Sequence, residues 1–128
     1  MDANRFFSVS YDIAANLKVR MLMRKEGGYA ALGRLIALYA MLYDNGGRLD
    51  LTRELVAETV NDALDLDDAS GFVESCAVCD LVRISYTDRG MRVECESVIK
   101  ELQFKKTQRK RSKKAAEARW GKKDDGER

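Results

Sequence analysis

The sequence predicts a mainly α-helical domain with a small β-hairpin, followed by a basic C-terminal helix. Three observations predict it. Helical apolar spacing recurs between residues 16 and 80, in a chain of 128 residues without proline. Two segments with alternating apolar residues then flank the turn Thr87-Asp88-Arg89-Gly90, which indicates a hairpin. After residue 104 apolar residues become scarce and Lys and Arg dominate. One domain of about 100 residues and a tail fit this length.

Two helices are expected first. Residues 16–26 have helical apolar spacing and end at Gly27-Gly28, a pair that terminates helices. Residues 29–44 are apolar on almost every face, so we expect them to form the central helix. The polar side of the first helix is basic and consists of Lys18, Arg20, Arg24 and Lys25.

Two further helices follow a tight turn. Asn45-Gly46-Gly47 predicts the turn and residues 48–50 a very short strand, with Asp50 or Thr52 capping a helix over about residues 51–64. This third helix is expected to bury Leu51, Leu55, Val56, Val60, Ala63 and Leu64. A fourth helix, capped by the acidic residues 65–68, runs to about Asp80 with an apolar stripe of Ala69, Phe72, Val73, Cys76 and Cys79.

The hairpin and a last helix close the domain. One face of the first strand carries Val82, Ile84 and Tyr86, and one face of the second carries Met91, Val93 and Cys95. The last helix should begin near Glu96 and dock through Val98, Ile99, Leu102 and Phe104. Apart from the first helix, this is the element order of a winged helix-turn-helix. We therefore predict a winged helix-turn-helix-like domain over residues 5–104 and a basic C-terminal helix or tail over residues 105–128.

The charges divide the chain at the same place. Residues 1–99 carry 11 Lys and Arg against 16 Asp and Glu, whereas residues 100–128 carry 12 against 5. A nearly neutral total of +2 therefore hides an acidic body and a basic tail. Such a positive block is typical of a protein that binds a polyanion, nucleic acid first and an anionic membrane second.

Several chemistries are disfavoured. The chain has no histidine, which excludes Ser-His, Cys-His and His-metal sites, and it has no glycine-rich phosphate loop. Cys76, Cys79 and Cys95 all lie on apolar faces, so we interpret them as core residues rather than as a zinc or redox site. We therefore predict no enzymatic activity, no metal and no cofactor.

The fourth helix is the one that a winged helix ordinarily lays in the major groove, but it is acidic. No Lys or Arg lies between Asp62 and Leu81, so phosphates would repel this helix. The basic tail is the better candidate. We predict that phosphates are bound by Lys105, Lys106, Arg109, Lys110, Arg111, Lys113, Lys114 and Arg119, that Trp120 stacks or packs, and that Arg89 and Arg92 of the wing assist.

Three questions stay open at this stage. The tail favours a helix by composition, but its crowded like charges oppose one until an anion neutralises them, so folding on contact is one expectation. The tail is alternatively a solvated, solubilising segment or a contact for a protein partner. A homodimer through the final helix or the first two helices is a further hypothesis. The absence of a signal peptide or an apolar span predicts a soluble, cytoplasmic protein with no membrane partner.

Two segments resemble a known family. Residues 18–51 read KVRMLMRKEGGYAALGRLIALYAMLYDNGGRLDL and residues 111–123 read RSKKAAEARWGKK. Both resemble the N-terminal region and following basic segment of replication-associated proteins of Gram-positive phages and integrated elements, of the DnaD-like replication initiation type. The chain departs from that pattern at Ala30-Ala31-Leu32, where an aromatic residue and Trp are frequent.

The resemblance implies a winged-helix-like fold and a role in phage or mobile-element replication, as an initiation or replisome accessory protein that binds DNA in preference to RNA. The alternative is a protein-protein interaction adapter, or a transcriptional regulator, in which the basic tail is incidental and the core binds a replisome or regulatory partner.

Overall fold

A computed structural model describes the backbone of residues 9 and 12–126 and the side chains of residues 9 and 12–119. In chain order, its elements are the short 3-10 helix η2 (Ile13–Ala15), α1 (Leu17–Glu26), α2 (Tyr29–Asp44), β1 (Arg48–Asp50), α3 (Glu54–Ala63), α4 (Ser70–Val78), β2 (Arg83–Thr87), β3 (Gly90–Glu94) and α5 (Glu96–Gly126).

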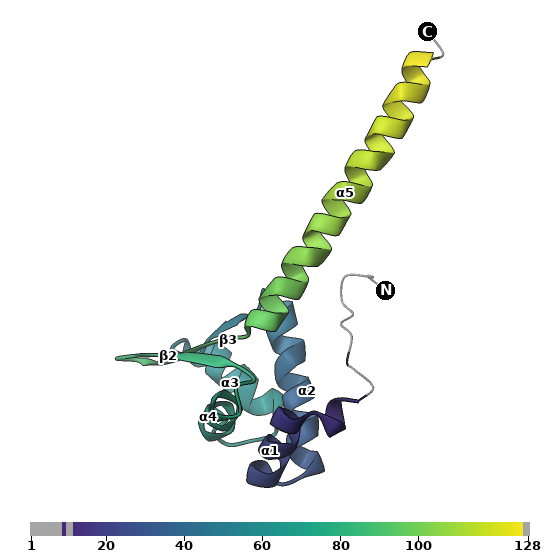
Figure 1. Cartoon of the computed structure of the whole chain (residues 1–128). Helices are drawn as coiled ribbons and strands as arrows, with labels where there is room; N and C mark the ends of the chain where they lie inside the picture. Colours follow the sequence, from purple (N-terminus) through teal and green to yellow (C-terminus); the bar gives the residue numbers. More distant parts are fainter. Residues whose placement is uncertain (1–8, 10–11, 127–128) are drawn as a thin grey trace.

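The predicted fold class is confirmed: the protein is mainly helical, with a small antiparallel sheet and a C-terminal helix. The sheet has three strands in the order β1-β3-β2, because the predicted stub strand pairs with the second strand of the hairpin. Ile84 lies opposite Val93, and Tyr86 lies opposite Met91, as the alternation predicted. Figure 1 shows α1 and α4 below the sheet, α2 running upward beside it to the base of α5, and α5 leaving the body in the upward direction.

The core is centred on α2. Leu35, Leu38 and Leu42 are completely buried on this helix, which explains why its sequence is so apolar. The predicted stripe of α4 is buried in full, and the cysteines at 76, 79 and 95 are buried free thiols within the same cluster. The cysteines are therefore core residues, as their positions predicted.

Local hydrogen bonds define the ends of the helices. Asn16 caps α1, because its side chain accepts from the backbone N–H groups of Lys18 and Val19. Gly27 follows in the left-handed region with φ +97°, which ends the helix as the glycine pair predicted. Ser75 of α4 donates a hydrogen bond to Glu26, which ties α1 to α4.

Some predictions of burial were wrong. Leu55 is 74% exposed and Ala63 is also exposed, because α3 turns Val56 and Val60 toward the core instead. The Asp50 carboxylate accepts hydrogen bonds from Thr52 instead of capping α3 directly. Tyr86 is 68% exposed, since the hairpin extends past the helices. Phe104 is 62% exposed and does not dock on the core.

Candidate nucleic-acid interface

The first turns of α5 are fixed to the body. The Val98 side chain is buried, and Leu102 packs against the core cluster. The backbone N–H of Cys95 donates to the carbonyl of Gly47 at 2.9 Å, which holds the start of the helix against the turn between α2 and β1. The Tyr43 hydroxyl donates to the Glu101 carboxylate. Desolvation by burial, and then this hydrogen bond, raise the pKa of Tyr43. These contacts set the direction in which the rest of α5 leaves the body.

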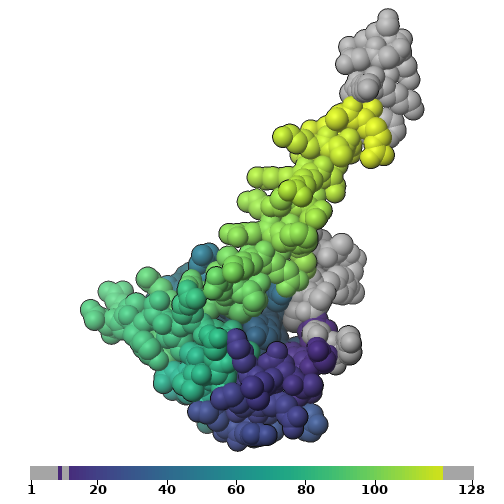
Figure 2. Space-filling view, viewed as in Figure 1, coloured from purple at the N-terminus to yellow at the C-terminus, as the bar shows by residue number. Residues whose placement is uncertain are grey.

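Beyond Lys105 the helix projects into solvent. All side chains from Lys106 to Arg119 are exposed, and Figure 2 shows this segment as a rod that stands out from the body. Residues 106–119 therefore form a surface that a large ligand can reach from several sides. We call residues Lys106–Arg119 the free segment of α5.

The free segment is helical although it buries nothing, and no break separates it from the docked turns. Folding only after contact with an anion is therefore not what the structure shows. The docked turns supply the nucleus, and each further residue adds a hydrogen bond to an existing helix. Lys, Arg, Ala, Gln and Glu, which favour helices, make up most of the segment. Two i,i+4 ion pairs, Lys100–Glu96 and Lys105–Glu101, support the first turns.

The structure brings most of the predicted cations together on this one rod. The exposed ones are Lys106, Arg109, Lys110, Arg111, Lys113, Lys114 and Arg119. Lys105 differs from them, because it is half-buried, lies 3.4 Å from Glu101 and has its ammonium group 5.8 Å from the centre of the Tyr43 ring. Lys105 thus belongs to the docked first turns of α5 rather than to its exposed segment.

The wing arginines lie elsewhere. Arg92 is on β3, where its guanidinium is 3.6 Å from the Asp50 carboxylate. The Asp50 pKa is lowered, first by the Thr52 hydrogen bond and also by Arg92. Arg89 lies exposed in the hairpin turn. The structure thus leaves Arg89 more open than Arg92 to contribute a positive charge to a ligand at the wing. The predicted stacking of Trp120 falls on a side chain outside the described residues.

The helix α4, which stands in the ordinary recognition position of a winged helix, exposes no Lys or Arg side chain. The exposed positions of α4 are Gly71, Glu74 and Val78, with no cation among them. Asp68 precedes the helix and accepts from the Ser70 N–H, which lowers the pKa of its carboxyl group. The N-terminal end of α4 is therefore negatively charged at neutral pH.

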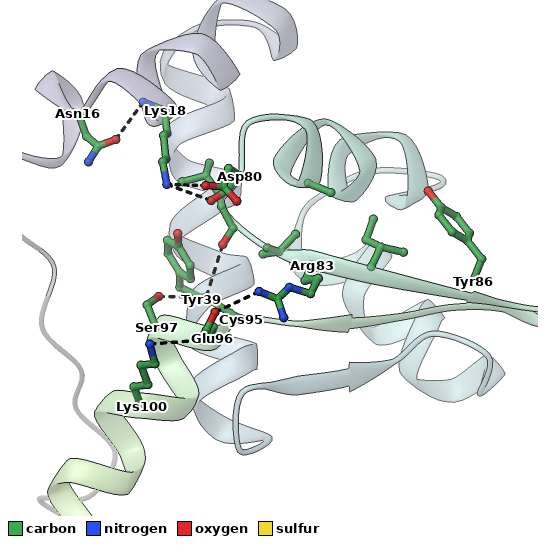
Figure 3. A pocket seen from close by; sticks show the side chains of 14 residues that line it. Asn16, Lys18, Tyr39, Asp80, Arg83, Tyr86, Cys95, Glu96, Ser97 and Lys100 are labelled. Carbon is green, nitrogen blue, oxygen red and sulfur yellow. Dashed lines mark hydrogen bonds and ion pairs between the residues drawn. The ribbon is translucent and has the colours of Figure 1, made fainter.

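A second candidate site is a cavity of about 710 Å³ between the start of α1, the end of α4, β2 and the start of α5. Figure 3 shows cations and anions facing one another across it. Lys18 pairs with Asp80 at 2.8 Å, and Glu96 pairs with both Arg83 and Lys100 at 3.1 Å. These pairs lower the pKa of both carboxyl groups. The charges of the cavity are thus mutually satisfied.

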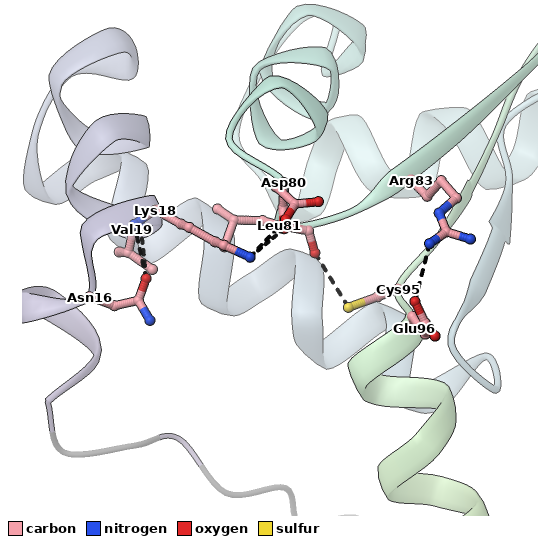
Figure 4. A network of polar contacts seen from close by, with 8 residues as sticks. All are labelled: Asn16, Lys18, Val19, Asp80, Leu81, Arg83, Cys95 and Glu96. Carbon is pink, nitrogen blue, oxygen red and sulfur yellow. Dashed lines mark hydrogen bonds and ion pairs between the residues drawn. The ribbon is translucent and has the colours of Figure 1, made fainter.

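The same ion pairs join separate elements, as Figure 4 shows. Lys18–Asp80 links α1 to the end of α4, and Arg83–Glu96 links β2 to α5. The Cys95 thiol donates to the carbonyl of Leu81 at 3.5 Å. We therefore interpret this network as structural.

Cys76, Cys79 and Cys95 are buried free thiols. Within residues 12–119, no group of three or more His, Cys, Asp or Glu side chains is arranged to hold a metal ion. Burial raises the pKa of the Cys76 thiol to about 12, so its reactive thiolate form is suppressed at neutral pH. Among the described helices, none combines the length and the apolarity that crossing a bilayer requires.

The chain matches no protein-family model, and comparisons with curated proteins and with solved structures found no significant match. The resemblance to phage replication proteins therefore stays a prediction.

One set of exposed residues of α5 was not predicted from the sequence, which pointed to the cations and Trp120 of the tail. Gln108, Ser112 and Ala115 are spaced i, i+4 and i+7 within the basic run, so they share a face of α5. Their spacing in the sequence is a usable signal once the segment is known to be one continuous helix.

Proposed function

We propose that this chain is a DNA-binding protein that holds phosphates through the free segment of α5. One observation carries the proposal: seven exposed Lys and Arg side chains lie between Lys106 and Arg119, against the single acid Glu117. None of the ion pairs among the described residues involves any of these cations. Because they have no acidic partners there, their charge is available to a polyanion.

The energetics favour a phosphate backbone over a small anion. Cations that replace condensed counterions on DNA gain affinity through the release of those ions. A row of cations on one helix matches a row of phosphates, whereas a single anion meets only one or two of the side chains. The acidic body disfavours close approach of the same polyanion at α4, so the projection of α5 away from the body separates the binding surface from the repelling one.

A role in the replication of a phage or mobile element is part of this proposal and rests on the resemblance of residues 18–51 and 111–123. The body then positions α5. The rival function, an adapter whose tail is incidental, differs in predicting no direct contact with DNA.

The test measures fluorescence anisotropy of labelled duplex DNA with the full chain over a salt series. The first variant replaces Arg109, Lys110 and Lys113 with Gln, and the matched control replaces Arg20, Arg24 and Lys25 of α1 with Gln. Both variants lose three exposed positive charges from a helix. Because Gln is nearly as good a helix former as Lys and Arg, both should keep their helicity.

The α5 variant should bind at least tenfold more weakly and reduce the slope of log K against log salt by about 3 units, since each lost phosphate contact removes about 0.9. The α1 variant should bind like the unmodified chain. Equal losses in the two variants would mean that only net charge matters. No binding at low salt by the unmodified chain would reject the DNA function and favour the adapter.

A further inference from the structure

The free segment of α5 has one uncharged strip along its length. Gln108, Ser112 and Ala115 occur at i, i+4 and i+7, and all three are exposed. At 100° per residue they fall within about 60° of one another around the helix axis. Arg119, at i+11, extends the same strip by one turn. In the middle of the strip the side chains of Ser112 and Ala115 are short. At its two ends the side chains of Gln108 and Arg119 are able to form hydrogen bonds.

Cations flank this strip on both sides. Relative to its centre, Arg109 lies about 90° to one side and Arg111 about 70° to the other. Lys113 lies about 130° from the centre on the side of Arg109, and Lys114 lies about 130° from it on the side of Arg111. All four are exposed and outside the ion pairs of the described residues. A helix with a neutral strip between two positive flanks matches a groove whose floor carries base edges and whose two walls carry phosphates.

The dimensions agree with a major groove. The free segment spans 14 residues from Lys106 to Arg119, or about 20 Å at 1.5 Å per residue. A helix with its side chains is about 10–12 Å across, and the major groove is about 12 Å wide and about 8.5 Å deep. Basic helices that continue beyond a folded dimerisation domain lie in the major groove in this way.

The body does not cover the strip. Leu102 packs on the core, and Gln108 lies six residues further along, which places it about 120° around the axis from Leu102. Glu101, seven residues before Gln108, lies in line with the strip and contacts Tyr43, but Gln108, Ser112 and Ala115 all lie beyond that contact and are exposed. A duplex seated on it contacts the flanking cations without first displacing a side chain of the body.

We propose that α5 binds double-stranded DNA by lying in its major groove, with the strip toward the base edges and the flanks toward the two backbones. This inference rests on the DNA-binding function proposed above. Gln and Arg are able to read adenine and guanine edges, and the Ala methyl group contacts thymine methyl groups. Single strands are bound largely by stacking on aromatic side chains, and the free segment itself contains no aromatic residue, since Phe104 and Trp120 lie just outside it.

The first experiment compares the full chain on a duplex and on either of its single strands by anisotropy at one salt concentration. The duplex should be bound at least tenfold more tightly. Methyl green, which occupies the major groove, should compete with the protein, and netropsin, which occupies the minor groove of A·T sequences, should not.

The second experiment adds bulk to the strip without changing charge. Ser112→Trp places an indole on the strip, and the control Gln103→Trp places the same side chain about 180° round the helix, outside both flanks. Both native side chains are uncharged and exposed. Circular dichroism checks that both variants keep the helix.

Ser112→Trp should weaken duplex binding at least tenfold, whereas Gln103→Trp should change it less than threefold. Equal effects of the two substitutions, equal affinity for duplex and single strands, or competition by netropsin instead of methyl green would each overturn the groove proposal while leaving DNA binding intact. No binding to either nucleic acid would reject the proposed function itself, so the two failures are distinguishable.

Discussion

The body and the free segment of α5 are held in shape by different forces. The body, residues 12–105, buries a cluster built around Leu35, Leu38 and Leu42. The free segment buries none of its described side chains, and its shape depends on backbone hydrogen bonds and helix propensity. A mutation in the body should therefore affect global unfolding, whereas a mutation in the free segment should affect the local helix and the proposed DNA contact. Paired substitutions at buried and exposed positions distinguish the two regions, from the largest expected effect on stability to the smallest.

The largest effect is expected for Leu42→Ala. Leu42 is completely buried in α2, so the substitution should lower the free energy of unfolding by about 2–5 kcal/mol. The control is Leu55→Ala, where the leucine is 74% exposed and the change should cost under about 0.5 kcal/mol. Urea denaturation followed by circular dichroism measures both. Similar losses would contradict the assignment of Leu55 to the surface.

A smaller effect is expected at the junction between the two regions. Gly47 has φ +89°, and an added Cβ would collide with the Ile99 side chain at the start of α5. Gly47→Ala should therefore cost about 2–4 kcal/mol through backbone strain and overpacking. Gly46 has φ +73° but no atom within 4 Å of an added Cβ, so Gly46→Ala should cost only about 1 kcal/mol. Thermal unfolding compares the pair, and equal costs would mean that α5 is not seated against this turn.

Acid should weaken the body modestly. The pKa of Asp80 is lowered by its hydrogen bond and ion pair with Lys18, and that of Glu96 by Lys100 and then Arg83. A carboxyl group with a lowered pKa stabilises the fold above its ordinary pKa, 3.8 for Asp and 4.5 for Glu, and loses that contribution as the pH falls through its lowered value. The urea midpoint should therefore decline below about pH 4.5.

The variant Asp80→Asn tests this cause. It should have a lower urea midpoint at pH 7 and a weaker decline in acid than the unmodified chain. The control is Asp62→Asn, since Asp62 is exposed and makes none of the ion pairs within the described residues. If both variants kept the full acid dependence, the Lys18–Asp80 pair would not be its source.

The smallest effect on stability is expected in the free segment. Ala118→Gly should destabilise the local helix by about 1 kcal/mol and leave the unfolding midpoint of the body unchanged. Hydrogen exchange should show faster exchange around residue 118 and unaltered protection of α2. The control, Ala31→Gly, removes a completely buried methyl group from α2 and should accelerate exchange across the body. Neither substitution should slow the exchange of the α2 amides.

The sequence was most predictive where burial and local pattern agreed. The bounds of α2, the stub strand, the hairpin and the start of α5 follow from apolar periodicity and turn residues, and the structure confirms each of them. The pattern failed for Leu55 and Phe104, because apolar residues at a helix edge have a helical spacing whether or not another element covers them. Only packing against a neighbour decides which of them are buried.

The sequence by itself determined the two-part character of this protein: an acidic, apolar-patterned body and a run of cations that favours a helix by composition. Tertiary structure decided how the cations are used. Packing at Gly47, Tyr43 and Val98 fixes the base of α5, and this makes the run a helical continuation of the fold. The folded body also pairs Lys105 with Glu101 in the docked turns of α5, and it pairs Arg92 with Asp50. The reason is physical, since charge and propensity are properties of the residues, whereas direction and accessibility depend on what the folded body places beside them.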